Sequence, residues 1–133
     1  ISYSKKNVIR GLHMQTRNPQ GKYVSVLKGK VLDVVVDLRP KSKTFGKHFK
    51  IILSEKNSKS IYIPKGFAHG FCGLSKENYL LYSCSDYRNK SAELGIKWND
   101  TDFKIKWPKI KPIISTKDKK NITFADFKKS IKL

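Results

Sequence analysis

The N-terminal part of the chain holds a base, a fixed cation and an amide within a short span. Residues 10–15 read RGLHMQ and supply Arg10, His13 and Gln15, and Lys22 follows in the segment Gln20-Gly21-Lys22. Further along, the chain offers three more side chains that can handle protons, namely His69, Tyr82 and Asp118. Together these groups can remove, donate and stabilise protons, so the set is typical of a proton-transferring enzyme.

His13 is the leading candidate for a general base, because an imidazole has an unperturbed pKa of about 6.5 and can hold or release a proton near neutral pH. A lone histidine in a strand is more often structural. Asp118, in the segment Ser115-Thr116-Lys117-Asp118, could orient the ring and stabilise its charged form. The two residues are far apart in sequence, so their contact is a hypothesis.

Lys22 and Tyr82 each have a functional and a structural interpretation. Lys22 follows a glycine at the start of a predicted strand, so its ammonium could stabilise a developing negative charge such as an enolate oxygen. By composition alone, the favoured interpretation is one more surface lysine among 25. Tyr82 lies among apolar neighbours, where a phenol is either a core group or a proton donor, and core packing is the default.

The segment from Ile63 to Phe71 reads IPKGFAHGF and places Phe67, His69 and Phe71 on one face of a strand after a Pro-Gly turn. An imidazole between aromatic rings suits a pocket. The histidines show no His-x-His pair, no downstream glutamate at ligand spacing and no adjacent cysteine, so we expect no metal site. Neither a phosphate-binding glycine loop nor a Gly-x-Ser-x-Gly elbow is present, which argues against nucleotide hydrolysis and acyl transfer.

Strand patterns dominate the elements that must position these side chains. Residues 31–38 alternate between one face with Leu32, Val34, Val36 and Leu38, and another with Val31, Asp33, Val35 and Asp37. The second face must therefore meet something polar. We predict six further strands, at residues 8–15, 22–27, 48–53, 60–63, 67–74 and 79–84. Short strands at this spacing indicate an all-β sandwich or barrel.

The spacing of Arg10 and His13 within their predicted strand bears on the site. Arg10 and His13 are three residues apart and would lie on opposite faces of a regular strand, so a bulge or twist must intervene if both serve one site.

Residues 89–112 are less regular, with Trp98 and Trp107 in predicted loops. A short C-terminal helix is predicted from the helical spacing of Phe124, Phe127, Lys128 and Ile131, with Thr123 as N-cap.

The length and composition of the chain limit the classes of protein to which it can belong. We expect one domain over residues 1–133, which begin with Ile1 and so form part of a longer natural sequence. No apolar run reaches the roughly 18 residues of a membrane span and no signal-peptide pattern opens the chain, so we expect a cytoplasmic protein without a membrane partner. Cys72 and Cys84 are expected to be buried small hydrophobic residues and not a disulfide.

The net charge of +19 makes nucleic acid an obvious partner to consider. Only four of the 29 basic residues are arginines, although bidentate recognition of phosphates and base edges favours arginine. The lysines are also scattered through every segment. We therefore expect a field that attracts an anionic substrate and no nucleic-acid partner.

Seven segments, taken in order, resemble the dTDP-4-dehydrorhamnose 3,5-epimerase family over nearly the whole chain, from about Asn7 to Asp118. They are residues 10–15, 20–22, 29–39, 42–46, 63–71, 98–100 and 115–118. The resemblance implies a cupin-type jelly-roll β-barrel with a short C-terminal helix, a homodimer and no metal or cofactor. It also implies that the chain lacks the family's N-terminal portion, which includes strands exchanged between subunits.

The implied activity is epimerisation of a nucleotide-diphospho-4-keto sugar for bacterial surface polysaccharides. Carbons 3 and 5 can be epimerised because the neighbouring ketone acidifies their hydrogens. Among the implied catalytic residues, His13 is the base with Asp118 as its partner, Tyr82 the acid on the opposite face, and Lys22 the cation that stabilises the enolate. Arg10 matches the diphosphate contact. The remaining implied substrate-binding residues are Gln15, Asp33, His69, Tyr87 and Arg88.

Arg88 stands where the family usually has a tyrosine that helps to hold the nucleotide base. A GDP-linked 4-keto sugar, such as a heptose, therefore stays open beside a dTDP-linked one. Two different kinds of activity stay open as well. A ketoisomerase on the same barrel would move the ketone instead of inverting a carbon, and a non-catalytic cupin or a basic RNA-binding module would not depend on Lys22, Tyr82 and Asp118.

Overall fold

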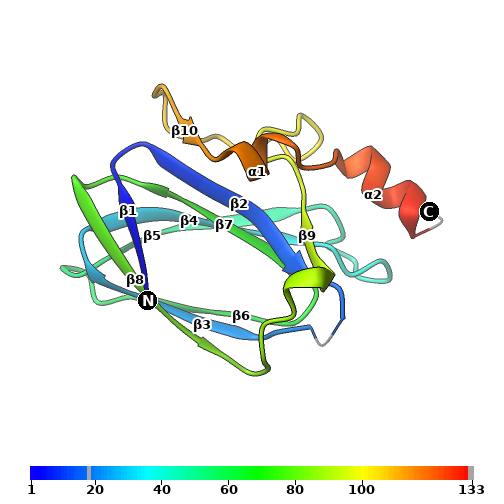
Figure 1. The fold of residues 1–133 in the computed structure, drawn as a ribbon, viewed down its shortest axis with the longest axis horizontal. Coiled ribbons are helices and arrows are strands. Elements are labelled where there is room, and N and C mark those ends of the chain that lie inside the picture. Colours follow the sequence, from blue (N-terminus) through cyan, green and yellow to red (C-terminus); the bar gives the residue numbers. More distant parts are fainter. Residues whose placement is uncertain (18, 132–133) are drawn as a thin grey trace.

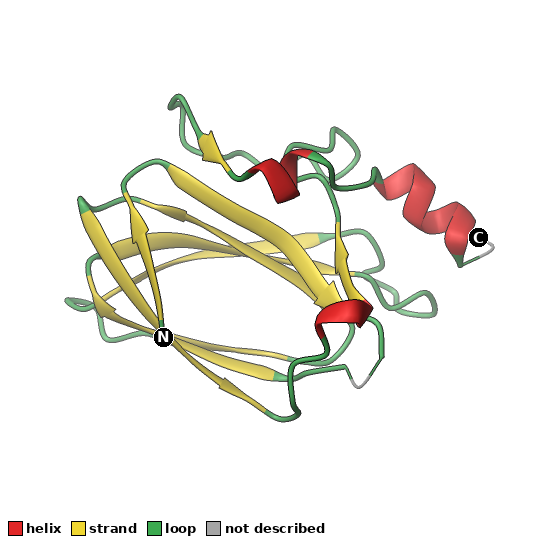
Figure 2. Ribbon diagram, viewed as in Figure 1, coloured by secondary structure: helices red, strands yellow, loops and turns green. Residues whose placement is uncertain are grey.

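The computed structural model describes residues 1–17 and 19–131, and it consists of two facing β-sheets with helical elements near the C-terminus (Figures 1 and 2). One sheet has the strand order β1 (Ser2–Lys5), β8 (Glu77–Cys84), β3 (Lys22–Lys28) and β6 (Ser60–Ile63). The other has the order β10 (Ile113–Ile114), β2 (Val8–Gln15), β7 (Phe67–Gly73), β4 (Lys30–Asp37) and β5 (His48–Ser54), with β9 (Glu93–Gly95) also paired to β2. The predicted all-β architecture is confirmed.

Apolar side chains of both sheets fill the space between them. Val24 and Leu80 from the first sheet meet Val31, Val35 and Phe71 from the second, and all of them are buried. Burying this much apolar surface is the main favourable free energy of such a sandwich. The inner faces therefore form a closed core over much of their length, and they leave room for a site only where polar side chains replace apolar ones.

The opposite face of the second sheet is covered by the C-terminal part of the chain, which Figure 1 shows running along the outside near β2. There Leu32, Val34 and Val36 of β4 pack with Phe124 and Phe127 of helix α2 (Phe124–Ser130). The predicted C-terminal helix is thus confirmed, and Thr123 caps it by accepting a hydrogen bond from the amide of Asp126 at 3.0 Å.

The second face of β4 meets polar groups, as expected, at its two acids and is otherwise apolar. Val31 and Val35 are buried between the sheets, since β4 is a central strand with a packed layer on each side. Polar partners meet only the two acids. Asp33 contacts His69, and Asp37 at the strand end binds Arg39 in a bidentate ion pair.

The predicted irregularity in β2 is present. Its register against β7 shifts between Arg10 and His13, so both side chains can serve the same side of the sheet. Gly11 lies at this point with φ +123°, and a Cβ there would lie 2.7 Å from the Cα of Gly70 and 2.8 Å from the carbonyl oxygen of His69. Only glycine accommodates both the backbone angle and this close approach.

Several small elements were not predicted from the sequence. They are β1, β9, β10, the 3-10 helix η1 (Lys90–Ala92) and helix α1 (Thr116–Lys119). Trp98 and Trp107 lie in loops as predicted, and the indole Nε1 of Trp107 donates to the carbonyl of Trp98 at 2.8 Å. Both cysteines are free thiols, but Cys84 is exposed and not buried, and it is the last residue of β8.

In the part of the chain that the structure describes, no helix has the length and apolar character needed to cross a membrane.

Candidate active site

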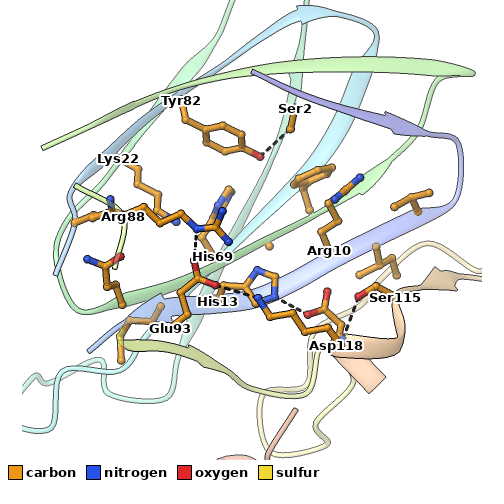
Figure 3. Close-up of a pocket in the computed structure, with 18 of the residues that line it drawn as sticks. Ser2, Arg10, His13, Lys22, His69, Tyr82, Arg88, Glu93, Ser115 and Asp118 are labelled. Atoms are coloured by element: carbon orange, nitrogen blue, oxygen red, sulfur yellow. Dashed lines mark hydrogen bonds and ion pairs between the residues drawn. The ribbon is translucent and has the colours of Figure 1, made fainter. Parts of the chain in front are cut away.

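A cavity of about 770 Å³ opens between the sheets, beside the core (Figure 3). Strands β2, β3, β7 and β8 and helix α1 all contribute to its wall. Of the side chains proposed from the sequence, eight line it: Arg10, His13, Gln15, Lys22, His69, Tyr82, Arg88 and Asp118. Residues from widely separated parts of the sequence therefore meet at one place, as a catalytic site requires.

His13 and Asp118 form an ion pair at the base of this cavity. The Nε2 atom of His13 lies 2.5 Å from Oδ1 of Asp118, and the side chains are 32% and 3% exposed. Oδ2 of Asp118 accepts a hydrogen bond from the backbone amide of Gly11 at 3.1 Å. Burial alone would raise the pKa of Asp118, but the hydrogen bonds from His13 and Gly11 outweigh it and hold this pKa below its ordinary value.

Asp118 owes its position to a short local structure. Ser115 is the N-cap of α1, and its hydroxyl oxygen accepts the backbone N–H of Asp118 at 3.1 Å. Asn121 donates a further hydrogen bond to Oδ1 of Asp118 at 3.3 Å. The carboxylate is therefore ionised and fixed, so it can orient the His13 ring and stabilise the imidazolium that forms when His13 takes a proton.

His69 and Asp33 form a second, fully enclosed pair. Nε2 of His69 lies 2.7 Å from Oδ2 of Asp33, and the two side chains are 5% and 0% exposed. The His69 ring lines the cavity, where it packs edge-on against Tyr82 at 6.2 Å between ring centroids. Asp33 lies behind it, and among the described residues its Oδ1 atom is a buried oxygen without a hydrogen-bond partner. The pair fixes one imidazole in the cavity wall.

His13 and His69 face each other across strands β2 and β7. Each ring gives its Nε2 atom to a different carboxylate. Within residues 1–17 and 19–131, no three histidine, cysteine, aspartate or glutamate side chains gather as a metal site would require.

Lys22 is not one more surface lysine, because its side chain lines the cavity beside Cys84, its pairing partner on β8. Burial lowers the pKa of Lys22, and this effect is partly offset by the nearby Cys84, Glu93 and Asp33. A partly desolvated ammonium at a fixed point is well suited to stabilise a negative oxygen.

Tyr82 combines the two interpretations given to it. Its ring packs against the core between the sheets, while its hydroxyl reaches the cavity on the side opposite His13 (Figure 3). Burial raises the pKa of Tyr82 above its ordinary value, and a hydrogen bond from Ser2 works in the other direction. The phenol therefore holds its proton near neutral pH and can act as an acid.

Cations surround the rest of the cavity. Arg10 is held by β1, since its Nε donates to Oγ of Ser4 at 2.8 Å and its Nη2 donates to the carbonyl of Tyr3 at 3.1 Å. Arg88 and Lys117 bind the two carboxylate oxygens of Glu93 at 2.5 and 3.0 Å. The lining thus holds four cations, Arg10, Lys22, Arg88 and Lys117, beside the carboxylates of Glu93 and Asp118, and this excess of positive charge favours an anionic ligand.

Gln15 lines the cavity and also contacts the backbone around Arg88. The amide of Gln15 donates to the carbonyl of Tyr87 at 3.1 Å and accepts from the backbone N–H of Asn89 at 2.8 Å. Gln15 is therefore hydrogen-bonded to the backbone on both sides of Arg88. The Tyr87 side chain is 91% exposed and lies outside the cavity wall.

Some cavity residues were not identified from the sequence, notably Ser2, Glu93 and Lys117. The position of Lys117 next to Asp118 could have indicated it. Ser2 and Glu93 carry no comparable signal, because they reach the cavity only through the pairing of β1 with β8 and of β9 with β2.

Comparison with known proteins adds an independent line of evidence. Residues 1–126 match the family model described as dTDP-4-dehydrorhamnose 3,5-epimerase. The chain is similar to a dTDP-4-dehydrorhamnose 3,5-epimerase of Neisseria gonorrhoeae, with 47% identity over 130 residues, which cover 97% of this chain and 40% of that protein.

Two solved structures are also similar. One is a dTDP-6-deoxy-D-glucose-3,5-epimerase of Legionella pneumophila in complex with dTDP-4-keto-L-rhamnose, with a TM-score of 0.90 and 45% identity over 92% of this chain and 65% of that one. The other is a 4-keto-6-deoxy sugar epimerase from the novobiocin gene cluster of Streptomyces spheroides, with a TM-score of 0.94 and 34% identity over 99% and 67% of the chains. The predicted cupin-type jelly-roll fold is thereby confirmed. The chain spans 40% to 67% of the length of these three relatives.

Proposed function

Because the chain belongs to the dTDP-4-dehydrorhamnose 3,5-epimerase family, we propose that it inverts carbon 3, carbon 5 or both in a nucleotide-diphospho-4-keto-6-deoxy sugar. The observation that carries the proposal is the arrangement of a base and an acid across one cavity. His13, paired with Asp118 at 2.5 Å, lies on one side and Tyr82 on the other.

The reaction follows from this arrangement. The 4-keto group acidifies the C–H bonds beside it, and His13 removes one of these hydrogens as a proton while the electron pair of the C–H bond moves into an enolate. The Lys22 ammonium stabilises the enolate oxygen. Tyr82 then donates its proton to the same carbon from the other face, the ketone reforms, and the configuration is inverted. No oxidant, metal or coenzyme takes part in these steps.

The charged rim supports a nucleotide-sugar substrate. Arg10 and Lys117 are placed to bind a diphosphate, and the Legionella relative binds a dTDP-linked keto sugar. A dTDP-linked substrate is therefore our first choice, with a GDP-linked 4-keto sugar as the alternative that Arg88 suggests. Calorimetric titration with dTDP and GDP distinguishes them, since the preferred nucleotide should bind at least about tenfold more tightly, or about 1.4 kcal/mol.

The homodimer implied by the resemblance belongs to the same proposal. A set of large side chains lies exposed on the four-stranded sheet: Tyr3, Tyr23, Leu27, Tyr62 and Leu81. Tyr23 pairs directly with Tyr62 and alternates with buried Val24, so these residues share the outer face of the sheet. An exposed apolar face of this kind is typical of a subunit interface. Sedimentation velocity measures the oligomeric state directly.

The proposed role is that of a cytoplasmic enzyme in the synthesis of surface polysaccharides, with residues 1–133 forming one cupin-like domain. Activity is tested by incubating the protein with a dTDP-4-keto-6-deoxyhexose and following the product by NMR. Inversion at carbon 3 or 5 supports the proposal. Movement of the ketone to another carbon would indicate the ketoisomerase, and tight, strongly salt-dependent binding of RNA without turnover would indicate a binding module.

A further inference from the structure

Strand β1 contacts two groups of the proposed site. The carbonyl of Tyr3 and the hydroxyl of Ser4 hold Arg10. The hydroxyl of Ser2 lines the cavity and donates a hydrogen bond to the phenol oxygen of Tyr82 at 3.3 Å. Strand register explains this contact, because Ser2 pairs with Leu80 and therefore lies diagonally opposite Tyr82 on β8.

We propose that Ser2 is a positioning residue for Tyr82. The Ser2 hydroxyl fixes the phenol at the cavity and stabilises the phenolate that is left after Tyr82 donates its proton. The inference rests on the proposed function for its catalytic consequence. A phenol oxygen that accepts a hydrogen bond from Ser2 keeps its own O–H for a partner in the cavity. When that O–H bond breaks, its electron pair stays on the phenol oxygen, where the Ser2 donor strengthens as the oxygen becomes charged.

The other polar groups around Tyr82 are bound to other partners or share only the cavity with it. On β7, the His69 ring meets the Tyr82 ring edge-on, and its Nε2 is bound to Asp33. On β2, the Arg10 guanidinium is tied to β1. Lys22 on β3 and Cys84 on β8 share the cavity. Among the described residues, Ser2 is the one side chain with a hydrogen bond to the Tyr82 hydroxyl.

The test is the pKa of the Tyr82 phenol, measured by NMR on protein labelled with carbon-13 at the tyrosine Cζ and assigned with Tyr82→Phe. Removing a hydrogen-bond donor from the phenolate should raise this pKa by roughly half a unit to one unit in Ser2→Ala. Ser2→Thr and Ser2→Val form the decisive pair, because the two side chains have nearly the same shape and only threonine keeps the hydroxyl. We expect Ser2→Thr to keep the wild-type pKa and Ser2→Val to raise it.

Ser25→Ala is the matched control, since it removes a serine hydroxyl from the same sheet. This hydroxyl is hydrogen-bonded to Ser60 at 2.8 Å and does not line the cavity. It should leave the pKa of Tyr82 unchanged. An unchanged pKa in both Ser2→Ala and Ser2→Val would overturn the proposal, and so would a raised pKa in Ser2→Thr equal to that in Ser2→Val.

The catalytic consequence is measured separately. In Ser2→Val, kcat should fall about three- to tenfold with KM nearly unchanged, and the alkaline limb of the kcat profile should move to higher pH together with the phenol pKa. Lys22 can also titrate in this range, and for that reason the NMR titration decides the assignment. A protein that turns over no 4-keto sugar, but whose Tyr82 pKa responds to Ser2 as expected, would refute the proposed function and leave the Ser2–Tyr82 interaction intact.

Discussion

The Oδ1 atom of Asp118 lies 2.5 Å from Nε2 of His13, although 105 residues separate the two in the sequence. Asp118 is also bonded to the backbone amide of Gly11, two residues before His13, so carboxylate, ring and strand are fixed together. This pair is the main structural support for the proposed role of His13 as a base. A histidine with this partner keeps a defined orientation and gains a stabilised cationic form.

Replacing Asp118 with asparagine should keep the shape of the site but remove the charge that stabilises protonated His13. We expect kcat to fall by roughly 10²- to 10⁴-fold, with a much smaller change in KM. Steady-state kinetics with a dTDP-4-keto-6-deoxyhexose measures both. A loss below tenfold would mean that the carboxylate has no catalytic role, and an unchanged melting temperature would show that the variant is folded.

Arg10 and Lys22 should separate into binding and catalysis. Arg10→Ala removes a cation from the proposed diphosphate contact and should raise KM at least about tenfold, with a smaller effect on kcat. Lys22→Met keeps the bulk of the side chain but removes the charge that stabilises the enolate, so it should lower kcat by about 10²-fold or more. The reverse pattern in the two variants would assign the roles the other way round.

Glu93 should make stability depend on pH in the acid range. Hydrogen bonds from Arg88 and Lys117 outweigh burial and lower the pKa of Glu93 to about 2, from an ordinary value of 4.5. A carboxylate with a depressed folded-state pKa stabilises the protein above its unfolded-state pKa, and this contribution is lost as the pH falls through the folded-state value. The window is therefore from about pH 4.5 down to about pH 2.

The corresponding experiment compares urea unfolding of the wild type and Glu93→Gln at several pH values. Glu93→Gln should be less stable near pH 7 by about 1–2 kcal/mol, allowing for the solvent exposure of Arg88 and Lys117. This difference should shrink between pH 4.5 and pH 2. A difference that stays constant over the window would show that the ion pairs do not contribute in the way described.

Gly11 should be a demanding position for folding. Gly11→Ala places a methyl group against the backbone of His69 and Gly70 and forces alanine to adopt φ +123°. We expect the free energy of unfolding to fall by at least about 2 kcal/mol, as measured by chemical denaturation. Ala125→Gly, at an exposed position in helix α2, provides a comparison and should cost about 1 kcal/mol or less. Equal small effects would contradict the strained geometry assigned to Gly11.

Sequence patterns predicted what local spacing determines. The division of residues 31–38 between two faces, the helical spacing from Phe124 and the bulge between Arg10 and His13 all appear in the structure. The same patterns could not reveal Ser2 or Glu93, because these reach the cavity through the register of short strands far apart in the chain. Nor could they show that β4 is covered by packed layers on both faces, because alternation alone does not identify a central strand.

The site was predicted to different degrees for similar reasons. The clustering of His13, Lys22, Tyr82 and Asp118 came from a family resemblance, and the cavity brings all four together. The exposed position of Tyr87 was not foreseeable, because it depends on how the Gln15 amide grips the backbone on both sides of Arg88.

Exchange of the substrate hydrogens with solvent tests the central role of His13 most directly. In D₂O, the wild type should incorporate deuterium at carbon 3, carbon 5 or both of a dTDP-4-keto-6-deoxyhexose, as observed by NMR. His13→Ala should abolish this exchange, and His13→Asn should reduce it to a lesser extent. Tyr82→Phe should retain proton removal and lose inversion. Undiminished exchange in folded His13→Ala would show that another group removes the proton, and the assignment of His13 as the base would be wrong.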